Sequence, residues 1–337
     1  MSISKRDAFA ACCRYLGVTR LLSALPTKPI LLVLNYHRIG NREETPFDSE
    51  VFSATAEELD EHVRFLKRRL HVATLDEAIE IVEKRKRPRG AAALLTFDDG
   101  YLDNYEAAFP VLAAHGVQGV FFLPTAFVGT DRLSWWDMIA YLVKHTRRRT
   151  IRLGIPPFPE FDLAALGAAQ ATSRITAIYK AEARESSEPF IGMLEEACGL
   201  PRPGGSVRCF LNWEEAAALV RGGMAIGSHS HNHSILSRLS DEEQLADLAT
   251  SKRILEERLG VPVHALSYPV GSRNCFSSAT REAAIQAQYR VAFSFYGGLN
   301  RFGAIDPYDI RRLHVFPAVA RFRLRVALAA VGGNDWF

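Results

Sequence analysis

The run Ala91-Ala-Ala-Leu-Leu-Thr-Phe97, followed at once by Asp98-Asp99-Gly100-Tyr101, decides the fold of this chain. An uncharged run that ends in a polar turn is typical of a strand buried on both faces. A helical pattern over residues 103–115 ends at Gly116, and a second apolar run covers residues 119–123. This order of strand, helix and strand predicts a parallel sheet, with both aspartates at the carboxyl end of a strand.

The same alternation of short apolar runs and amphipathic helical stretches occupies most of the remaining chain. Capping boxes that start at Thr55, Thr74 and Ser240 mark the N-termini of three helices. Further strands are predicted at residues 29–36, 224–227, 264–267, 290–295 and 310–315. About seven strand-and-helix units predict an α/β fold whose mainly parallel sheet closes into a barrel.

Residues 130–211 interrupt this alternation with a helix near residues 136–145 and Ala-rich helical stretches after residue 163. We interpret them as a mainly helical insertion into a barrel that spans residues 29–320. Residues 1–28 then form an N-terminal helical segment and residues 321–337 a C-terminal amphipathic tail. Both ends mix basic and apolar residues, so each is either a helix docked on the barrel or a helix in peripheral contact with a membrane.

The composition excludes several classes of protein. The chain has 337 residues, 48% of them hydrophobic, and 41 basic against 38 acidic residues, which is typical of a globular protein and gives no general argument for nucleic acid as a partner. Its five cysteines are odd in number and lack CxxC spacing, which indicates a reducing compartment. Because no apolar run approaches the ~20 residues of a membrane span, we expect a cytoplasmic protein.

Polar residues follow four of the predicted strands at their carboxyl ends. They are Tyr36-His37, Asp98-Asp99, His229-Ser-His-Asn-His233 and Tyr268-Pro269-Val270-Gly271. Function in parallel α/β sheets lies at this edge, so we expect two carboxylates and several imidazoles to converge there.

Adjacent aspartates repel each other unless a cation or hydrogen-bond donors offset their charges. Two imidazoles in an HxxxH spacing and one carboxylate form a donor set typical of a catalytic zinc site with open positions. The second aspartate is then free to act as a base. The alternatives are a capped turn without a catalytic role at Asp98-Asp99 and a polar loop without metal at His229 to His233.

These motifs resemble those of the polysaccharide deacetylases, the NodB-homology family of carbohydrate esterases. The resemblance rests on Thr96-Phe-Asp-Asp-Gly-Tyr101 with Asp103-Asn104, on His229 to His233, and on Tyr268 to Gly271, and it runs from about residue 30 to 315 outside the insertion. It implies a distorted (β/α)7 barrel and a metal-dependent hydrolase that removes acetyl groups from N-acetylated sugars. The opening Asn35-Tyr-His-Arg38 is similar to the branch that acts on exopolysaccharides and surface glycans.

The resemblance also implies roles for single residues. Asp99, His229 and His233 would hold the metal, which we expect to be Zn²⁺, with another divalent first-row ion as the alternative. Asp98 would be the general base toward a metal-bound water, and His314 the general acid. The metal and a backbone N–H of the turn from Tyr268 to Gly271, that of Val270, would stabilise the oxyanion.

The chain departs from the family pattern at two positions. Family members often carry Arg where this sequence has Ser267, and Tyr where it has Val270. Arg312 is a candidate replacement for the missing guanidinium, but the register leaves open whether Arg312 or His314 faces outward. His37 is either a residue that orients a metal ligand or a structural histidine.

The substrate expected from this pattern is an N-acetylated sugar or glycan, linked to a lipid or nucleotide and recognised by the insertion. Two alternatives stay open: a deformylase or O-deacetylase of a carrier-linked sugar, and a non-catalytic glycan-binding barrel. Trp135 and Trp136 are expected in a helix core, with stacking on a sugar ring as the alternative.

Overall fold

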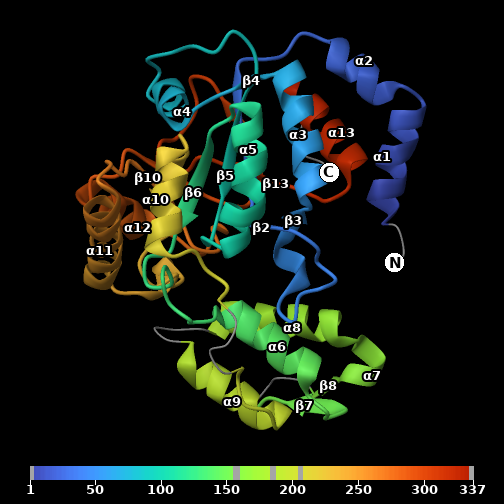
Figure 1. The fold of residues 1–337 in the computed structure, drawn as a ribbon, viewed down its shortest axis with the longest axis vertical. Coiled ribbons are helices and arrows are strands. Elements are labelled where there is room, and N and C mark those ends of the chain that lie inside the picture. The colour runs from blue at the N-terminus through green and yellow to red at the C-terminus, as the bar shows by residue number, and fades with distance from the viewer. Residues whose placement is uncertain (1–3, 155–159, 183–186, 204–207, 334–337) are drawn as a thin grey trace.

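The computed structural model describes residues 4–154, 160–182, 187–203 and 208–333. Within them, seven parallel strands curl around a common core (Figure 1). The strands are β1 (Ile30–Tyr36), β5 (Ala92–Phe97), β6 (Gly119–Leu123), β9 (Ala225–Ser228), β10 (Ala265–Ser267), β11 (Val291–Phe293) and β13 (Arg312–His314).

The ring of strands closes through the last of them. The order β11-β10-β9-β6-β5-β1 is continued by β13, which pairs with β1 in parallel. Ile310, two residues before β13, bridges back to Phe293 of β11. The predicted α/β fold with a (β/α)7 barrel is therefore confirmed, and the single bridge at the closure is its distortion. Two short strands, β4 (His71–Val72) and β12 (Asn300–Arg301), pair with the first residues of β5 and β1, respectively.

Helices cover the outside of the barrel as the capping signals predict. The boxes at Thr55, Thr74 and Ser240 are all present, and another starts at Asn212. The expected helix over residues 103–115 instead opens with a π-helical turn, Asn104–Ala108, since Pro110 lacks the N–H that would continue α-helical bonding. The outer helices are α3 (Ala56–Arg69), α5 (Phe109–His115), α10 (Trp213–Arg221), α11 (Asp241–Leu259) and α12 (Ser278–Gln286), while α4 (Leu75–Val82) lies at one end of the barrel.

Side chains that point alternately to the two faces of each strand contribute to two different hydrophobic cores. Leu31 and Val33 of β1, with Ala92 and Leu94 of β5, belong to the core inside the barrel, which α4 closes at one end. Their neighbours in sequence pack outward against the helices. Since side chains alternate with a period of two, the inner rows continue to Asn35 and His37 on β1 and to Thr96 and Asp98 on β5.

The described helices and strands between residues 135 and 198 form a layer below the barrel in Figure 1, and their hydrophobic core also includes Phe47 and Tyr101. The elements of this layer are α6 (Trp135–His145), α7 (Leu163–Leu166), α8 (Ala168–Glu182), α9 (Glu188–Cys198) and a hairpin of β7 (Thr150–Arg152) and β8 (Glu160–Asp162). The hairpin was not predicted. In Figure 1 this layer lies across the barrel end that carries the site.

The two ends of the chain pack against each other. Helices α1 (Lys5–Tyr15) and α2 (Val18–Ala24) lie on α13 (Val319–Ala330), which packs on α3. Phe322 and Val326 of α13 belong to the main core. A further pair, β2 (Arg38–Ile39) and β3 (Phe52–Ala54), borders the site. Within the described ranges, no helix has both the length and the apolar character needed to cross a membrane.

Candidate metal centre and active site

The aspartate pair lies where β5 turns sharply. Asp98 continues the inward row of the strand, and Asp99 follows with a left-handed backbone, φ 73°. Gly100 is left-handed as well, and a Cβ there would approach Leu123 Cδ2 to 2.9 Å, so glycine is favoured at this position. Aspartate tolerates the left-handed region better than most residues, which lets this turn aim two consecutive carboxylates at one site.

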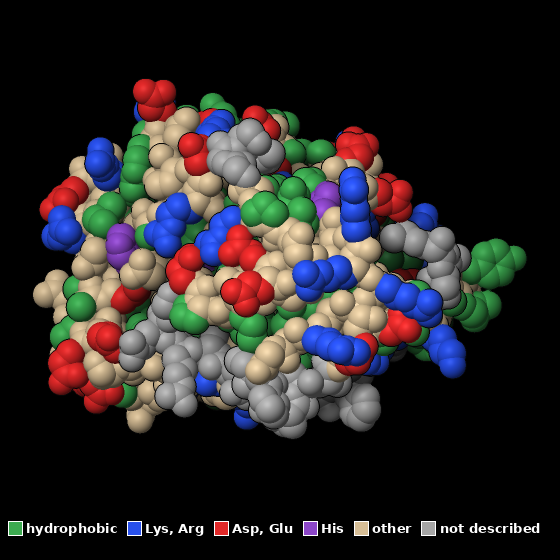
Figure 2. Space-filling view, turned by 90° about the horizontal axis from the view of Figure 1, so that it is seen from below, with side chains coloured by type: hydrophobic (Ala, Val, Ile, Leu, Met, Phe, Trp, Pro, Cys, Tyr) green, Lys and Arg blue, Asp and Glu red, His purple; other side chains and the backbone are tan. Residues whose placement is uncertain are grey.

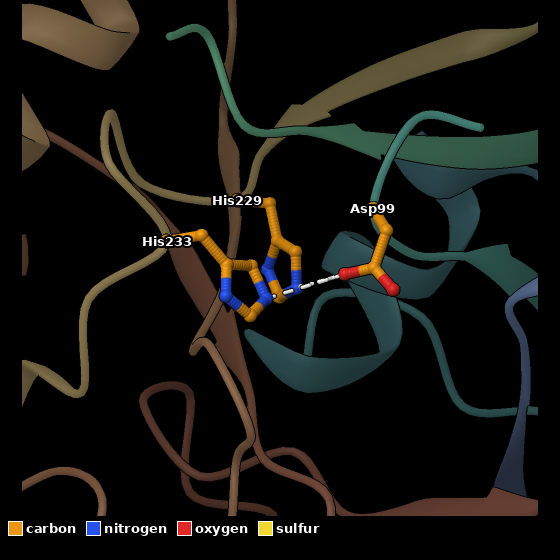
Figure 3. A group of neighbouring side chains, drawn as sticks. All are labelled: Asp99, His229 and His233. Atoms are coloured by element: carbon orange, nitrogen blue, oxygen red, sulfur yellow. Dashed lines mark ion pairs between the residues drawn. The ribbon is translucent and has the colours of Figure 1, made fainter. Parts of the chain in front are cut away.

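Asp99, His229 and His233 converge on one point (Figure 3). Asp99 Oδ1 lies 3.3 Å from His229 Nε2 and 3.2 Å from His233 Nε2. All three side chains are buried, and their donor atoms lie within 4.8 Å of one another. His233 also has a left-handed backbone, φ 55°, a strain of about 1–3 kcal/mol that concentrates at functional sites.

A hydrogen bond orients the imidazole of His229, whereas ring packing holds that of His233, whose Nδ1 has no hydrogen-bond partner among the described residues. His229 Nδ1 donates to the Ser267 carbonyl at 2.8 Å, which leaves Nε2 with a free lone pair toward Asp99. Trp136 packs beside the ring of His233 at 4.5 Å. The site thus brings two imidazole nitrogens and one carboxylate oxygen together. This donor set fits a divalent first-row metal.

The charges of the site shift its pKa values. Burial alone would raise the pKa of Asp98 and Asp99, but the Arg312 guanidinium and His229 lower that of Asp98, and the two imidazoles lower that of Asp99 below its usual range. Burial lowers the pKa of His233, whereas Asp98 and Asp99 outweigh burial at His229 and raise its pKa. Both carboxylates are thus held in the ionised form.

Asp98 is fixed by three neighbours from three strands or strand ends. Arg312 Nη1 donates to Asp98 Oδ1 at 2.7 Å, while Asn35 Nδ2 and Ser267 Oγ donate to Oδ2 at 3.3 and 3.2 Å. Arg312 Nη2 also donates to Ser267 Oγ at 2.9 Å. Arg312 therefore faces inward and occupies the space beside Ser267; the sequence had left its direction open and had not indicated Asn35.

The turn after β10 brings one residue to the site. Val270 lines the cavity with a left-handed backbone, φ 62°, which is an outlier for a β-branched residue. Gly271 contacts Phe295 so closely that a Cβ would lie 2.7 Å from the Phe295 nitrogen. The Tyr268 side chain turns away and donates to the Tyr308 carbonyl, and Pro269 accepts a bond from the Gly271 N–H. Of the four turn residues, Val270 alone borders the cavity.

A cavity of about 150 Å³ opens over these groups. From the barrel it is lined by Asp98, Asp99 and both histidines of the cluster, with His37 and Phe295 beside them. His314 does not line it. Its ring packs against Phe295 and Phe316, at 5.8 and 4.6 Å between centroids, and burial lowers its pKa to about 3.

The insertion supplies the opposite wall. Trp135, Trp136, Thr176 and Lys180 border the cavity. Thr176 Oγ1 is buried and has no hydrogen-bond partner among the described residues. The two tryptophans were expected in a helix core, and they are buried in it as well as facing the cavity. Thr176 and Lys180 were missed because a helical pattern does not indicate which surface the helix covers.

Comparison with known proteins identifies the family. The sequence model of the polysaccharide deacetylases matches residues 85–292, more than half of the chain. The chain belongs to the polysaccharide deacetylase family. A relative in Bacillus subtilis (strain 168), YxkH, is named as a candidate polysaccharide deacetylase and is 22% identical over 296 residues, which cover 87% of this chain and 74% of that protein.

Solved structures of other polysaccharide deacetylases share this fold. The deacetylase PplD of Streptococcus pyogenes, solved with acetate, has a TM-score of 0.58 and 16% identity, covering 91% of this chain and 99% of PplD. IcaB of Ammonifex degensii has a TM-score of 0.57 and 19% identity, covering 88% and 98%. This polysaccharide deacetylase is therefore a hydrolase of carbon–nitrogen bonds other than peptide bonds, and its family membership supports deacetylation of a sugar polymer.

Proposed function

We propose that the chain is a metal-dependent deacetylase of N-acetylated sugar units. The observation that carries the proposal is the separation of roles between adjacent aspartates: Asp99 contacts both imidazoles, whereas Asp98 is held by Arg312, Asn35 and Ser267. A binding module would have no use for a second ionised carboxylate fixed beside a metal site. The proposal makes Asp98 the general base and Asp99, His229 and His233 the metal ligands.

A bound Zn²⁺, or another divalent first-row ion, would supply Lewis-acid polarisation of the acetamide carbonyl and lower the pKa of water. Asp98 accepts the proton of the attacking water at the carboxylate, and Arg312 keeps this carboxylate ionised and in place. The Val270 N–H is proposed to donate to the oxyanion, since Val270 is the turn residue that borders the cavity.

The proton for the leaving amine must come from a group that reaches the cavity. The sequence-based proposal was His314, but His37 lines the cavity and His314 packs behind Phe295. His37 is anchored by two backbone contacts: its N–H donates to Ser53 Oγ at 2.9 Å, and its carbonyl accepts from Asn104 Nδ2 at 2.7 Å. We therefore assign the proton donor to His37 in preference to His314.

The insertion is proposed to recognise the sugar. Trp135 and Trp136 offer aromatic faces and Thr176 a free hydroxyl. A second cavity of about 640 Å³ shares Trp135 and His233 with the first, which supports a substrate longer than one sugar unit. Lys180 has an exposed side chain and no ion-pair partner among the described residues, which supports a lipid- or nucleotide-linked sugar whose phosphates it would contact. The five free cysteines support a reducing, cytoplasmic site for this reaction.

The acyl group is tested by a matched substrate panel. N-acetylated, N-formylated and O-acetylated forms of one oligosaccharide, free and linked to a pyrophosphate carrier, are compared for release of acetate or formate. The proposal expects acetate from the N-acetylated forms. Release from the N-formylated or O-acetylated form alone would assign the site to a deformylase or an O-deacetylase, and tight binding without any release would indicate a glycan-binding barrel.

A further inference from the structure

The inner faces of the N-terminal helices are occupied by the fold. Ala10 and Cys13 of α1 form a buried cluster with Leu324 of α13, and Val18 and Leu22 pack at its border. This contact already buries one apolar side of α1 and α2. In a helix that lies on a protein surface, the opposite side is normally polar.

The outer faces of these helices are apolar instead. Tyr15, Leu16, Leu21 and Leu25 are 91%, 66%, 70% and 48% exposed. Of the six large hydrophobic side chains exposed within the described ranges, five lie between residues 9 and 25. Ala8, Ala11 and Cys12 of α1 are exposed as well, and their side chains are small and uncharged. A concentration of this kind marks an interaction surface.

Basic residues surround this apolar face. Residues 1–28 contain five basic residues and one acidic residue, a net charge of four positive against three for the whole chain. The acidic residue, Asp7, lies 3.5 Å from Arg321 and is thereby offset. None of the five basic residues has an ion-pair partner in the part of the chain that the structure describes: they are Lys5, Arg6, Arg14, Arg20 and Lys28, all exposed.

Figure 2 shows hydrophobic side chains that project beside Lys and Arg side chains at the edge of the molecule on which α1 lies in Figure 1. The sixth exposed hydrophobic, Ile285, belongs to α12, which lies on the other side of the barrel from α1. The apolar and basic surface is therefore confined to one side of the molecule.

We propose that the outer face of α1 and α2 docks on an anionic lipid surface, with Leu16 and Leu21 in the headgroup region and the basic residues against lipid phosphates. Amphipathic helices with Lys and Arg beside Leu and aromatic residues bind the membrane interface in this way. A second copy of the chain fits less well, because a symmetric contact would bring the same unpaired positive charges face to face. The inference does not depend on the catalytic assignment.

Vesicle binding of the full chain tests the proposal. Sedimentation with phosphatidylcholine vesicles is compared with sedimentation with vesicles that contain about 30 mol% phosphatidylglycerol, at low and high salt. We expect binding to the anionic vesicles that weakens as salt rises. The Leu16→Ser/Leu21→Ser variant should bind at least about tenfold more weakly, since both side chains lose their apolar contact with lipid. Arg14→Glu/Arg20→Glu should bind more weakly at low salt only.

Ile285→Ser is the matched control, because it removes an exposed hydrophobic from another face and should leave binding unchanged. Cys12 is the exposed member of the five cysteines, so an environment-sensitive fluorophore placed on it should shift to the blue with anionic vesicles. Binding that Ile285→Ser reduces as much as the Leu16/Leu21 variant would overturn the proposal. So would absence of vesicle binding together with a dimer that Leu16→Ser/Leu21→Ser converts to monomer.

Discussion

Arg312 Nη1 lies 2.7 Å from Asp98 Oδ1, and both side chains are buried. The two residues come from the last strand of the barrel and from the end of β5, with β1 between them. The guanidinium also reaches Ser267, the position at which the sequence resemblance leads us to expect an Arg. The charge of Arg312 would thus take the place of that Arg beside the proposed base.

Exchanging the residues at positions 267 and 312 tests the relationship between Arg312 and Asp98. Arg312→Met should lower kcat by about 10²-fold and the unfolding free energy by about 3–5 kcal/mol, because it leaves Asp98 as a buried charge without a partner. The exchange variant Ser267→Arg/Arg312→Ser should recover at least part of both losses. Steady-state kinetics and denaturant unfolding give the two readouts. An exchange variant as inactive as Arg312→Met, although folded, would show that the direction of the guanidinium is essential.

The assignment of the proton donor is tested by separate histidine variants. His37→Ala should reduce kcat by about 10²-fold or more, with little change in metal content, because His37 lines the cavity without belonging to the ligand cluster. His314→Ala should reduce kcat less, since its ring lies behind Phe295. A substrate with a good leaving group should restore much of the rate of the variant that lacks the proton donor. Rescue of His314→Ala instead of His37→Ala would return the role to His314.

The proposed contact of Lys180 with a substrate phosphate is tested by measuring KM. Lys180→Met should raise KM about tenfold for phosphate-linked substrates and leave kcat nearly unchanged, because the side chain borders the cavity and would contact a substrate group remote from the acetyl carbon. Arg174→Met on the same helix is the control, since Arg174 is exposed and does not line the cavity. Equal effects on free and phosphate-linked oligosaccharides would argue against phosphate recognition.

Acid should destabilise the barrel through His62. This side chain is buried between Tyr36 and Phe322, and burial lowers its pKa from 6.5 to about 3. The unfolded chain therefore takes up a proton below pH 6.5 that the folded chain refuses until about pH 3, so stability falls as pH falls through this window. The slope from this residue is at most about 1.4 kcal/mol per pH unit.

The contribution of His62 to the pH dependence of the unfolding free energy is measured by comparison with His62→Phe, which keeps the stacking on Phe322. Urea unfolding between about pH 4 and 6.5 should show a shallower pH dependence for this variant, with a constant offset from the lost bond to Tyr36. His145→Asn, a change at an exposed histidine, should keep the slope of the parent chain. Parallel curves for the parent and His62→Phe would show that His62 is not the group responsible.

The sequence predicted those parts of the molecule that depend on local patterns. Apolar runs marked the barrel strands, and capping boxes such as that of Thr55 fixed where helices begin. The general location of functional residues at the carboxyl ends of parallel strands led us to expect Asp98 and Asp99 at the site. These features are short-range, so they can be read from a single stretch of chain.

Contacts between distant stretches could not be predicted in the same way. Asn35 and Arg312 meet at 2.8 Å although 277 positions separate them, and their meeting depends on how the ring of strands closes. The direction of Arg312 follows from the pairing of Val33 with Arg312. Lys180 reaches the cavity because α8 lies across the barrel end, which no hydrophobic pattern of a helix specifies.

The central claim is tested most directly by acetate release from N-acetylated oligosaccharides, measured with metal content on the same samples. The account predicts that chelation abolishes release, that Zn²⁺ restores it, and that Asp98→Asn retains the metal but loses about 10²–10⁴-fold in kcat. Acetate release that survives complete removal of metal, or an Asp98→Asn variant with full activity, would contradict it.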